Sequence, residues 1–199
     1  MTAAACALQS AQRGHNTLLI DLCGDVPATL GLPEPTRPGI NDWLAEHSNS
    51  DASSMVLLGE PVMDGLVVVH RGSKFVDGQP RWASLADAIR TLSHHVIIDA
   101  GTGFIPSEIA QAVRQITLVT KPCYLSLRRA TTMPRPHNVA VVCEEGRALT
   151  VADVGHVLGV DVVAEVPHNT AIARAVDAGL LPSRVEQLFG SQLSHLLPS

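Results

Sequence analysis

Leu18-Leu19-Ile20-Asp21 and Val96-Ile97-Ile98-Asp99 are two short hydrophobic runs that each end in an aspartate, and the second continues as Ala100-Gly101-Thr102-Gly103. Runs of this kind are typical of buried strands in a parallel sheet. An acidic residue at the carboxyl end of such a strand can hold Mg²⁺, and a glycine turn lets the backbone approach a phosphate. The two runs therefore predict neighbouring strands of an open α/β sheet with a ligand site at their carboxyl ends.

The composition favours a single α/β domain. The chain has 199 residues, of which 46% are hydrophobic and only 3% aromatic, so its large core must be built from aliphatic side chains. A net charge of −5 gives no overall drive toward nucleic acid. The four cysteines show no C-x-x-C spacing, which suggests neither a zinc site nor a disulfide framework and favours a reducing, cytoplasmic environment. No run approaches the ~20 apolar residues of a transmembrane helix, so we expect a soluble protein.

Apolar runs alternate along the chain with helical patterns, as in βα units. Strands are predicted at 17–21, 65–70, 95–99, 115–120, 138–143 and 160–166, and helices at 2–13, 39–47, 81–93, 106–113, 124–131, 150–158, 169–178 and 184–196. The polar stretch Ser48–Ser54 is expected to be a connector. This alternation predicts a mainly parallel central sheet with helices on both faces, and one domain spanning 1–199.

Five segments in order resemble the MinD/ParA family of deviant Walker ATPases. The residues from Gln12 to Leu22 resemble the helix, glycine and strand that follow the family's phosphate-binding loop. Val96 to Gly103 looks like its Walker B strand. The remaining matches are the switch-side pieces Leu30–Leu32 and Gly39–Leu44, the strand and helix at Leu118–Ala130, and the last strand at Gly159–Pro167 with Ala171–Gly179 behind it. The resemblance implies a P-loop NTPase-like fold over almost the whole chain.

The same resemblance implies a set of roles. ATP and Mg²⁺ would be the cofactors, and the protein would be a homodimer with a protein partner. Asp21 and Asp25 would be the catalytic acids, and Asp99 would be the metal ligand. The other cofactor-binding positions would be Gly101 and Gly103 on the phosphate side and Pro167 and Asn169 on the adenine side. The family's function would be spatial positioning of a septum, chromosome or pilus, and thus cell division or partitioning.

Departures from the family pattern argue against ATP turnover by the chain as written. No G-x-x-x-x-G-K-[ST] loop precedes the helix that begins at Thr2, and the only lysines are Lys74 and Lys121. Family members usually carry a second acid at the position of Cys23, for which Asp25 is the candidate substitute. Either the sequence begins late, or the protein is a pseudo-ATPase.

Three functions remain open: a MinD/ParA-like nucleotide switch, an inactive scaffold acting through protein contacts, and a DNA-associated partition factor. Arg128, Arg129 and Arg135 are the candidate DNA contacts. Because adjacent helical residues diverge by ~100°, a solvated surface is favoured over nucleic-acid binding. The small apolar residues at the start of helix 2–13 predict a surface that another copy of the chain covers, and hence a homodimer.

Overall fold

The computed structural model describes residues 1–45, 51–72 and 80–197. Lys74 and the first part of the expected connector Ser48–Ser54 lie outside these residues. The chain groups into two compact units, one formed by Met1–Val113 with Arg174–Val185 and the other by Arg114–Ala173 with Glu186–Ser199. Each unit contains its own β-sheet. The single domain expected from the sequence stays a prediction.

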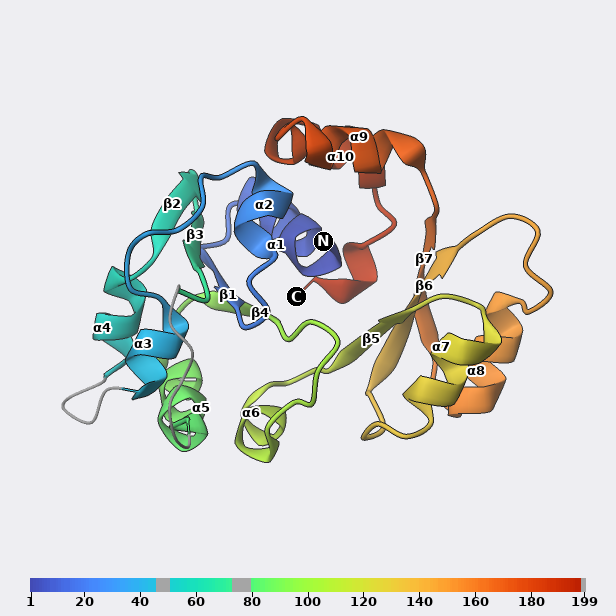
Figure 1. Ribbon diagram of the computed structural model, residues 1–199, viewed down its shortest axis with the longest axis horizontal. Helices are drawn as coiled ribbons and strands as arrows, with labels where there is room; N and C mark the ends of the chain where they lie inside the picture. Colours follow the sequence, from blue (N-terminus) through green and yellow to red (C-terminus); the bar gives the residue numbers. More distant parts are fainter. Residues whose placement is uncertain (46–50, 73–79, 198–199) are drawn as a thin grey trace. The chain divides into compact units, whose positions relative to one another are not determined.

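Unit 1 is built around a four-stranded sheet with the strand order β2-β3-β1-β4 (Figure 1). The central strand β1 runs parallel to β3 and to β4, whereas β2 is antiparallel to β3. The elements of this unit are α1 (Thr2–Gln12), β1 (Thr17–Asp21), α2 (Val26–Leu30), α3 (Ile40–Ala45), α4 (Ala52–Leu57), β2 (Glu60–Met63), β3 (Leu66–Val69), α5 (Trp82–Thr91), β4 (His95–Asp99) and α6 (Ser107–Ala112).

Helices cover both faces of this sheet. On one face, Leu18 and Ile20 of β1 pack with Val69 of β3 against residues of α3, α4, α5 and α6, and this cluster forms an apolar core of the unit. On the other face lies α1, whose Ser10 accepts a hydrogen bond of 2.8 Å from the Thr17 hydroxyl. Because successive strand residues face opposite sides, Asp21 lies on the α1 face together with Thr17.

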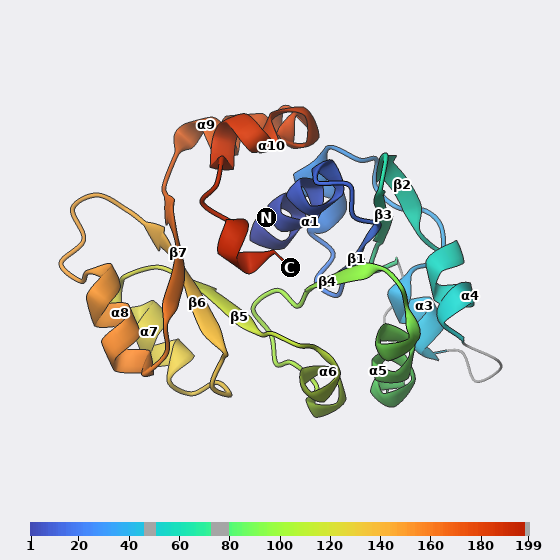
Figure 2. The same cartoon turned by 180° about the vertical axis from the view of Figure 1, so that it is seen from behind.

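Unit 2 has a three-stranded parallel sheet with the order β5-β6-β7. Its elements are β5 (Thr117–Thr120), α7 (Tyr124–Ala130), β6 (Asn138–Cys143), α8 (Val151–Leu158), β7 (Val162–Pro167) and the 3₁₀ turn η1 (Ser194–Leu196). Helices α7 and α8 lie side by side on one face, as both views show (Figures 1 and 2), and bury Val139 and Val141 of β6. Helices α9 (Thr170–Asp177) and α10 (Leu181–Phe189) contribute residues to both units.

The α/β architecture with mainly parallel sheets confirms the expected fold class, but the strands form two sheets instead of one. The periodicity of the sequence identifies which segments are strands. It does not show which strands are hydrogen-bonded to one another in the same sheet. Strand β2 was missed because its four residues contain a proline and show no clear alternation. The short helices α2 and α4 were also missed.

The prediction of one continuous helix over 184–196 is wrong. Helix α10 begins earlier, at Leu181, and ends at Phe189, and only η1 follows. Gly190 adopts a φ of 49°, a left-handed conformation that ends a helix. Helix α8 begins with a reciprocal capping box formed by Thr150 and Asp153. In the described part of the chain, no helix combines the length and hydrophobicity needed to cross a bilayer.

Candidate functional site

Asp21 and Asp99 lie at the carboxyl edge of the unit 1 sheet. They are register partners at the ends of the parallel strands β1 and β4. Neighbouring strands are about 4.8 Å apart, so the backbones of the two aspartates are adjacent. The sequence prediction that these two residues meet is therefore confirmed, and the carboxyl edge is the position where open α/β sheets bind ligands.

The Asp21 carboxylate is fully buried and is used by its own chain. Its Oδ1 accepts hydrogen bonds from the backbone N–H groups of Cys23 at 3.1 Å and Gly24 at 2.7 Å. Its Oδ2 accepts from the N–H of Val26 at 3.2 Å. A carboxylate with these bonds holds the loop 22–25 in one conformation. In this arrangement, both oxygens of Asp21 cap the loop that follows β1. Its catalytic role remains a prediction.

The Asp99 carboxylate is less enclosed, with a side-chain exposure of 15%. Its Oδ1 accepts a hydrogen bond of 2.9 Å from the Gly101 N–H, and its Oδ2 lies 3.7 Å from the Met1 nitrogen. The start of α1 thus lies beside Asp99, and the first N–H groups of a helix favour an anion. Among the described residues, the Asp99 carboxylate accepts one hydrogen bond, so its oxygens can accept further bonds or bind a cation.

Cys23 packs against the turn that follows Asp99. A Cβ atom placed on Gly101 would lie only 2.7 Å from the Cys23 Cβ, and Gly101 has a φ of 63°, so a glycine is required there. Burial raises the pKa of the Cys23 thiol to about 12, assisted by the Asp99 and Asp21 carboxylates. The thiol is neutral at physiological pH and offers no general base in place of an acid.

Asp25 and Gly103, two other predicted site residues, make few contacts in unit 1. Asp25 is exposed at the N-cap of α2, and its side chain makes no capping hydrogen bond. A Cβ atom on Gly103 would have no neighbour closer than 4.0 Å, so no steric contact requires a glycine at this position. Both residues lie in the loops that follow the paired aspartates, and the Asp25 carbonyl accepts a hydrogen bond of 2.8 Å from the Thr29 hydroxyl.

Two residues at this edge were missed by the sequence analysis. His70 directly follows β3, where Ile20 pairs with Val69, so it lies beside Asp21. His70 is 2% exposed; its Nδ1 accepts a hydrogen bond of 3.0 Å from Gly72, and its Nε2 has no hydrogen-bond partner among the described residues. Arg71 donates to the Cys23 carbonyl at 3.2 Å. The parallel strands of unit 1 all end at this edge. The end of the predicted strand 65–70 and the residue after it could therefore have been identified from the sequence as candidates for the site.

Pro167 and Asn169 belong to unit 2. Pro167 is the last residue of β7, and Asn169 accepts a hydrogen bond of 2.8 Å from the Ala171 N–H at the start of α9. The Asn169 oxygen therefore caps a helix in this structure. Their role toward an adenine base remains a prediction.

Glu144 anchors a charge cluster at the carboxyl edge of the unit 2 sheet. Its carboxylate forms ion pairs with Lys121 and Arg147. The hydrogen bonds from Lys121 and then from Arg147 lower the pKa of Glu144 to about 2. The charge of Glu144 is therefore neutralised by its own neighbours.

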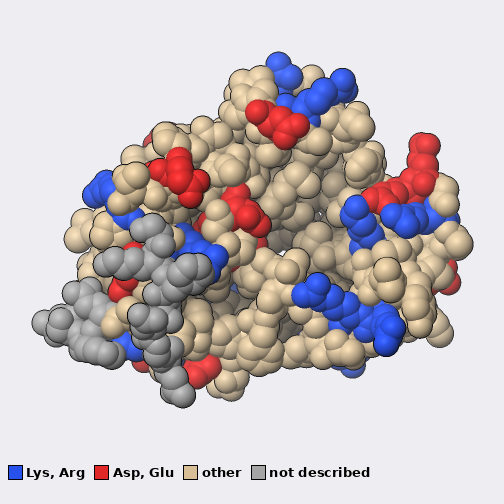
Figure 3. Space-filling view, viewed as in Figure 1, with Lys and Arg blue, Asp and Glu red and all other residues tan. Residues whose placement is uncertain are grey.

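Basic side chains gather over α7 on the face shown in Figure 3. Arg128 and Arg129 lie in the last turn of this helix and are exposed. Arg135, the third candidate DNA contact, instead donates to the Gly159 carbonyl. The three arginines thus do not act as one uniform basic edge.

The described residues of unit 1 fit a cation better than a triphosphate. Asp99 supplies one carboxylate, and Mg²⁺ is commonly held by one or two carboxylates with water and phosphate oxygens. Within 1–45, 51–72 and 80–197, no three His, Cys, Asp or Glu side chains converge on a metal site. For phosphate, this edge offers the start of α1 and Arg71, which already donates to Cys23. Mg²⁺ at Asp99 is therefore compatible with the geometry, and a phosphate would depend on backbone N–H groups.

No protein-family model and no curated protein matches the chain. Solved structures do match. A ParA family ATPase from Chlorobium tepidum TLS has a TM-score of 0.70 at 17% identity, covering 97% of this chain and 87% of that one. The MinD cell division protein of Aquifex aeolicus has a TM-score of 0.70 at 16% identity, covering 98% and 87%. The Mg-ADP complex of MinD from Pyrococcus horikoshii OT3 has a TM-score of 0.67 at 14% identity, covering 94% and 82%. The chain has a MinD/ParA-like fold.

Proposed function

We propose that this protein, with its MinD/ParA-like fold, is a switch protein for the spatial positioning of a cellular structure such as a septum, chromosome or pilus. The observation that carries the proposal is the pairing of Asp21 with Asp99 at the carboxyl edge, beside the start of α1. This is the edge at which an α/β fold binds its ligand. The similar MinD structure with Mg-ADP supports a nucleotide with Mg²⁺ as that ligand.

The second candidate is a scaffold of the same fold that binds partners without turning over ATP. It is favoured by the Asp21 carboxylate, whose two oxygens already accept backbone hydrogen bonds. It is also favoured by Cys23, whose raised pKa leaves a neutral thiol where relatives usually carry an acid. Asp25 is exposed and is the remaining acid that could orient a water molecule.

Nucleotide titrations separate these candidates. A fluorescent ATP analogue should bind more tightly with Mg²⁺ than with EDTA, and Asp99→Asn should remove that difference because it weakens the metal ligand. Asp87→Asn, an exposed acid on α5, is the matched control and should leave binding unchanged. Mg²⁺-dependent binding without steady ATP hydrolysis supports a binding switch, and absence of binding supports the scaffold. Steady hydrolysis that Asp99→Ala abolishes would overturn the expectation of an inactive enzyme.

A homodimer is part of the same proposal. The surface expected at the start of helix 2–13 is a wrong prediction, because Ala4, Ala5 and Ala7 are fully buried within their own chain. Strand β4 ends the sheet of unit 1, and no described strand bonds to its outer edge. The edge strand of a sheet can pair with a strand of another chain. Light scattering over a wide concentration range should show dimers; a monomer at all concentrations would contradict this proposal.

The cellular role needs a test in cells. A fluorescent fusion of the protein should concentrate at a division site, chromosome or cell pole, and its deletion should displace the corresponding structure. Direct DNA association is the other possibility for a partition factor. It predicts affinity that falls steeply with salt and is weakened by Arg128→Ala. A uniform distribution with no deletion phenotype would argue against a positioning role.

A further inference from the structure

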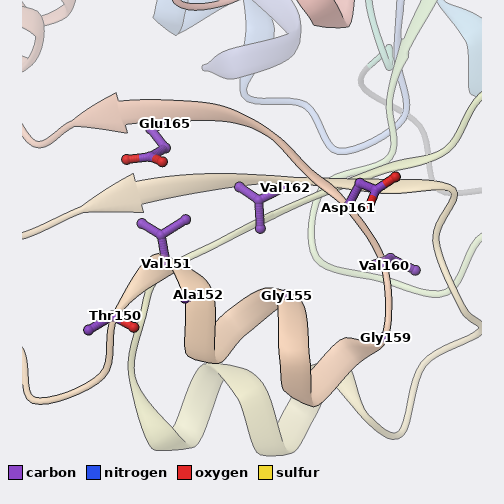
Figure 4. Close-up of a pocket in the computed structure, with 9 residues that line it drawn as sticks. All are labelled: Thr150, Val151, Ala152, Gly155, Gly159, Val160, Asp161, Val162 and Glu165. Atoms are coloured by element: carbon purple, nitrogen blue, oxygen red, sulfur yellow. The ribbon is translucent and has the colours of Figure 1, made fainter.

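An open groove runs between α8 and β7 within unit 2 (Figure 4). It has a volume of about 810 Å³. Its apolar wall includes Val151 at the start of α8 and Val162 at the start of β7, and Figure 4 shows both side chains projecting into the space between the two elements. A Cβ atom on Gly155 would lie 3.5 Å from Val162 Cγ2, an ordinary van der Waals distance, so the helix and the strand pack closely at this end of the groove.

Strand β7 forms the outer edge of this groove. It is the last strand in the order β5-β6-β7, and no described strand pairs with its outer side. The register between β6 and β7 shifts after Val139, but from Ala164 to Pro167 the strand continues in regular pairing with β6. An edge of this kind presents unpaired N–H and C=O groups to which an extended peptide can bond.

The groove is acidic. Asp161 and Glu165 are exposed and line it, and the lining contains no lysine or arginine. Helix α8 also ends there, and the carbonyl groups at a helix C-terminus favour a cation. One of these carbonyls, that of Gly159, already accepts a hydrogen bond from the Arg135 guanidinium. The charge of the groove therefore favours a basic occupant.

We propose that this groove binds an extended, basic segment of a partner protein, which adds as a strand to the outer edge of β7. Main-chain hydrogen bonds to β7 supply affinity, while alternate side chains of the peptide enter the groove. Small apolar side chains meet Val151 and Val162, and lysine or arginine side chains meet Glu165 and Asp161. A second copy of this chain is disfavoured, because a two-fold pairing of β7 with β7 would bring the acids of both copies together. This site is separate from the carboxyl edge of unit 1 and does not depend on a nucleotide.

Peptide binding to the full chain tests the proposal. The probe is a fluorescein-labelled peptide in which every second residue is serine and the residues between are alternately lysine and valine, so that one face carries both kinds of side chain. The same peptide with glutamate in place of lysine is its charge control. Only the basic peptide should bind saturably, and the backbone amide signals of 150–167 should shift in NMR spectra. N-methylation of alternate peptide nitrogens, which removes main-chain donors, should weaken binding by about tenfold or more.

Charge reversal locates the site. Glu165→Lys should lower the affinity of the protein for the basic peptide by about tenfold and raise its affinity for the acidic peptide. Glu145→Lys, an exposed acid outside the groove, is the matched control and should change the affinity by less than about twofold. Equal effects of the two variants, binding that is insensitive to N-methylation, or shifts confined to other strands would overturn the proposal. Concentration-dependent self-association through β7, detected by the same amide signals, would also overturn it in favour of a second copy as occupant.

Discussion

Asp21 and Asp99 are register partners at the ends of β1 and β4, yet their carboxylates are engaged differently. Asp21 is fully buried and accepts three backbone N–H groups from its own loop. Asp99 accepts one, from Gly101, and keeps a partly exposed oxygen beside the Met1 nitrogen. One aspartate therefore shapes the edge of the sheet, and the other is the residue that can meet a ligand there.

Replacing Asp21 should destabilise the fold. Asp21→Ala leaves the N–H groups of Cys23, Gly24 and Val26 without their acceptor, and we expect a loss of about 2–4 kcal/mol in the free energy of unfolding. Asp25→Ala is the control, because that exposed side chain makes no capping hydrogen bond; its effect should stay within about 0.5 kcal/mol. Urea denaturation measures both. Equal effects would show that Asp21 is not the structural cap described above.

The contact between Gly31 and Gly179 should not tolerate a methyl group. A Cβ atom on Gly31 would lie 2.4 Å from the Gly179 Cα, and Gly31 also has a φ of 71°. Gly14, with a φ of 86° and no atom within 4 Å of such a Cβ, provides a control for backbone strain alone. Gly14→Ala should cost about 1 kcal/mol, and Gly31→Ala about 1–3 kcal/mol more. Thermal unfolding of the two variants tests the difference; similar melting temperatures would contradict the close approach.

Glu144 should titrate far below an ordinary glutamate. Its pKa is lowered to about 2 from 4.5 by Lys121 and Arg147, so the folded state favours the charged carboxylate. The stabilisation from this cluster is therefore present above pH 4.5 and is lost as the pH falls toward 2. Carboxyl NMR titration should show the low pKa, and Lys121→Gln should raise it. Glu145→Gln should leave it unchanged; an ordinary pKa for Glu144 in the unmodified protein would refute the cluster.

Cys123 should be the first thiol to react with an alkylating reagent. Hydrogen bonds with Ser126 lower the pKa of Cys123, and Arg147 assists. Burial raises the pKa of both Cys6 and Cys23 to about 12, so their reactive thiolate forms are scarce at neutral pH. Peptide mapping by mass spectrometry after brief iodoacetamide treatment at pH 7.5 should find Cys123 modified first, and Ser126→Ala should slow it. Earlier labelling of Cys23 would count against the buried arrangement of the loop after β1.

The sequence by itself determined the features that depend on local pattern. The strands ending in Asp21 and Asp99 were located at their observed bounds, because a short aliphatic run between polar segments has few alternatives to a buried strand. The cap at Thr150 was also readable, since a capping box is encoded within four residues. The mainly parallel arrangement followed from the alternation of strands and helices.

Only the tertiary structure decided what depends on partners distant in the sequence. The assignment of strands to two sheets, the position of His70 beside Asp21 and the bond from Arg71 to the Cys23 carbonyl follow from strand register. Local periodicity does not specify register, because a strand's apolar pattern is the same whichever neighbour it pairs with. For the same reason, the sequence marked Asp21 as a site residue, whereas its complete burial and its hydrogen bonds with the loop 22–25 became visible only in the tertiary structure.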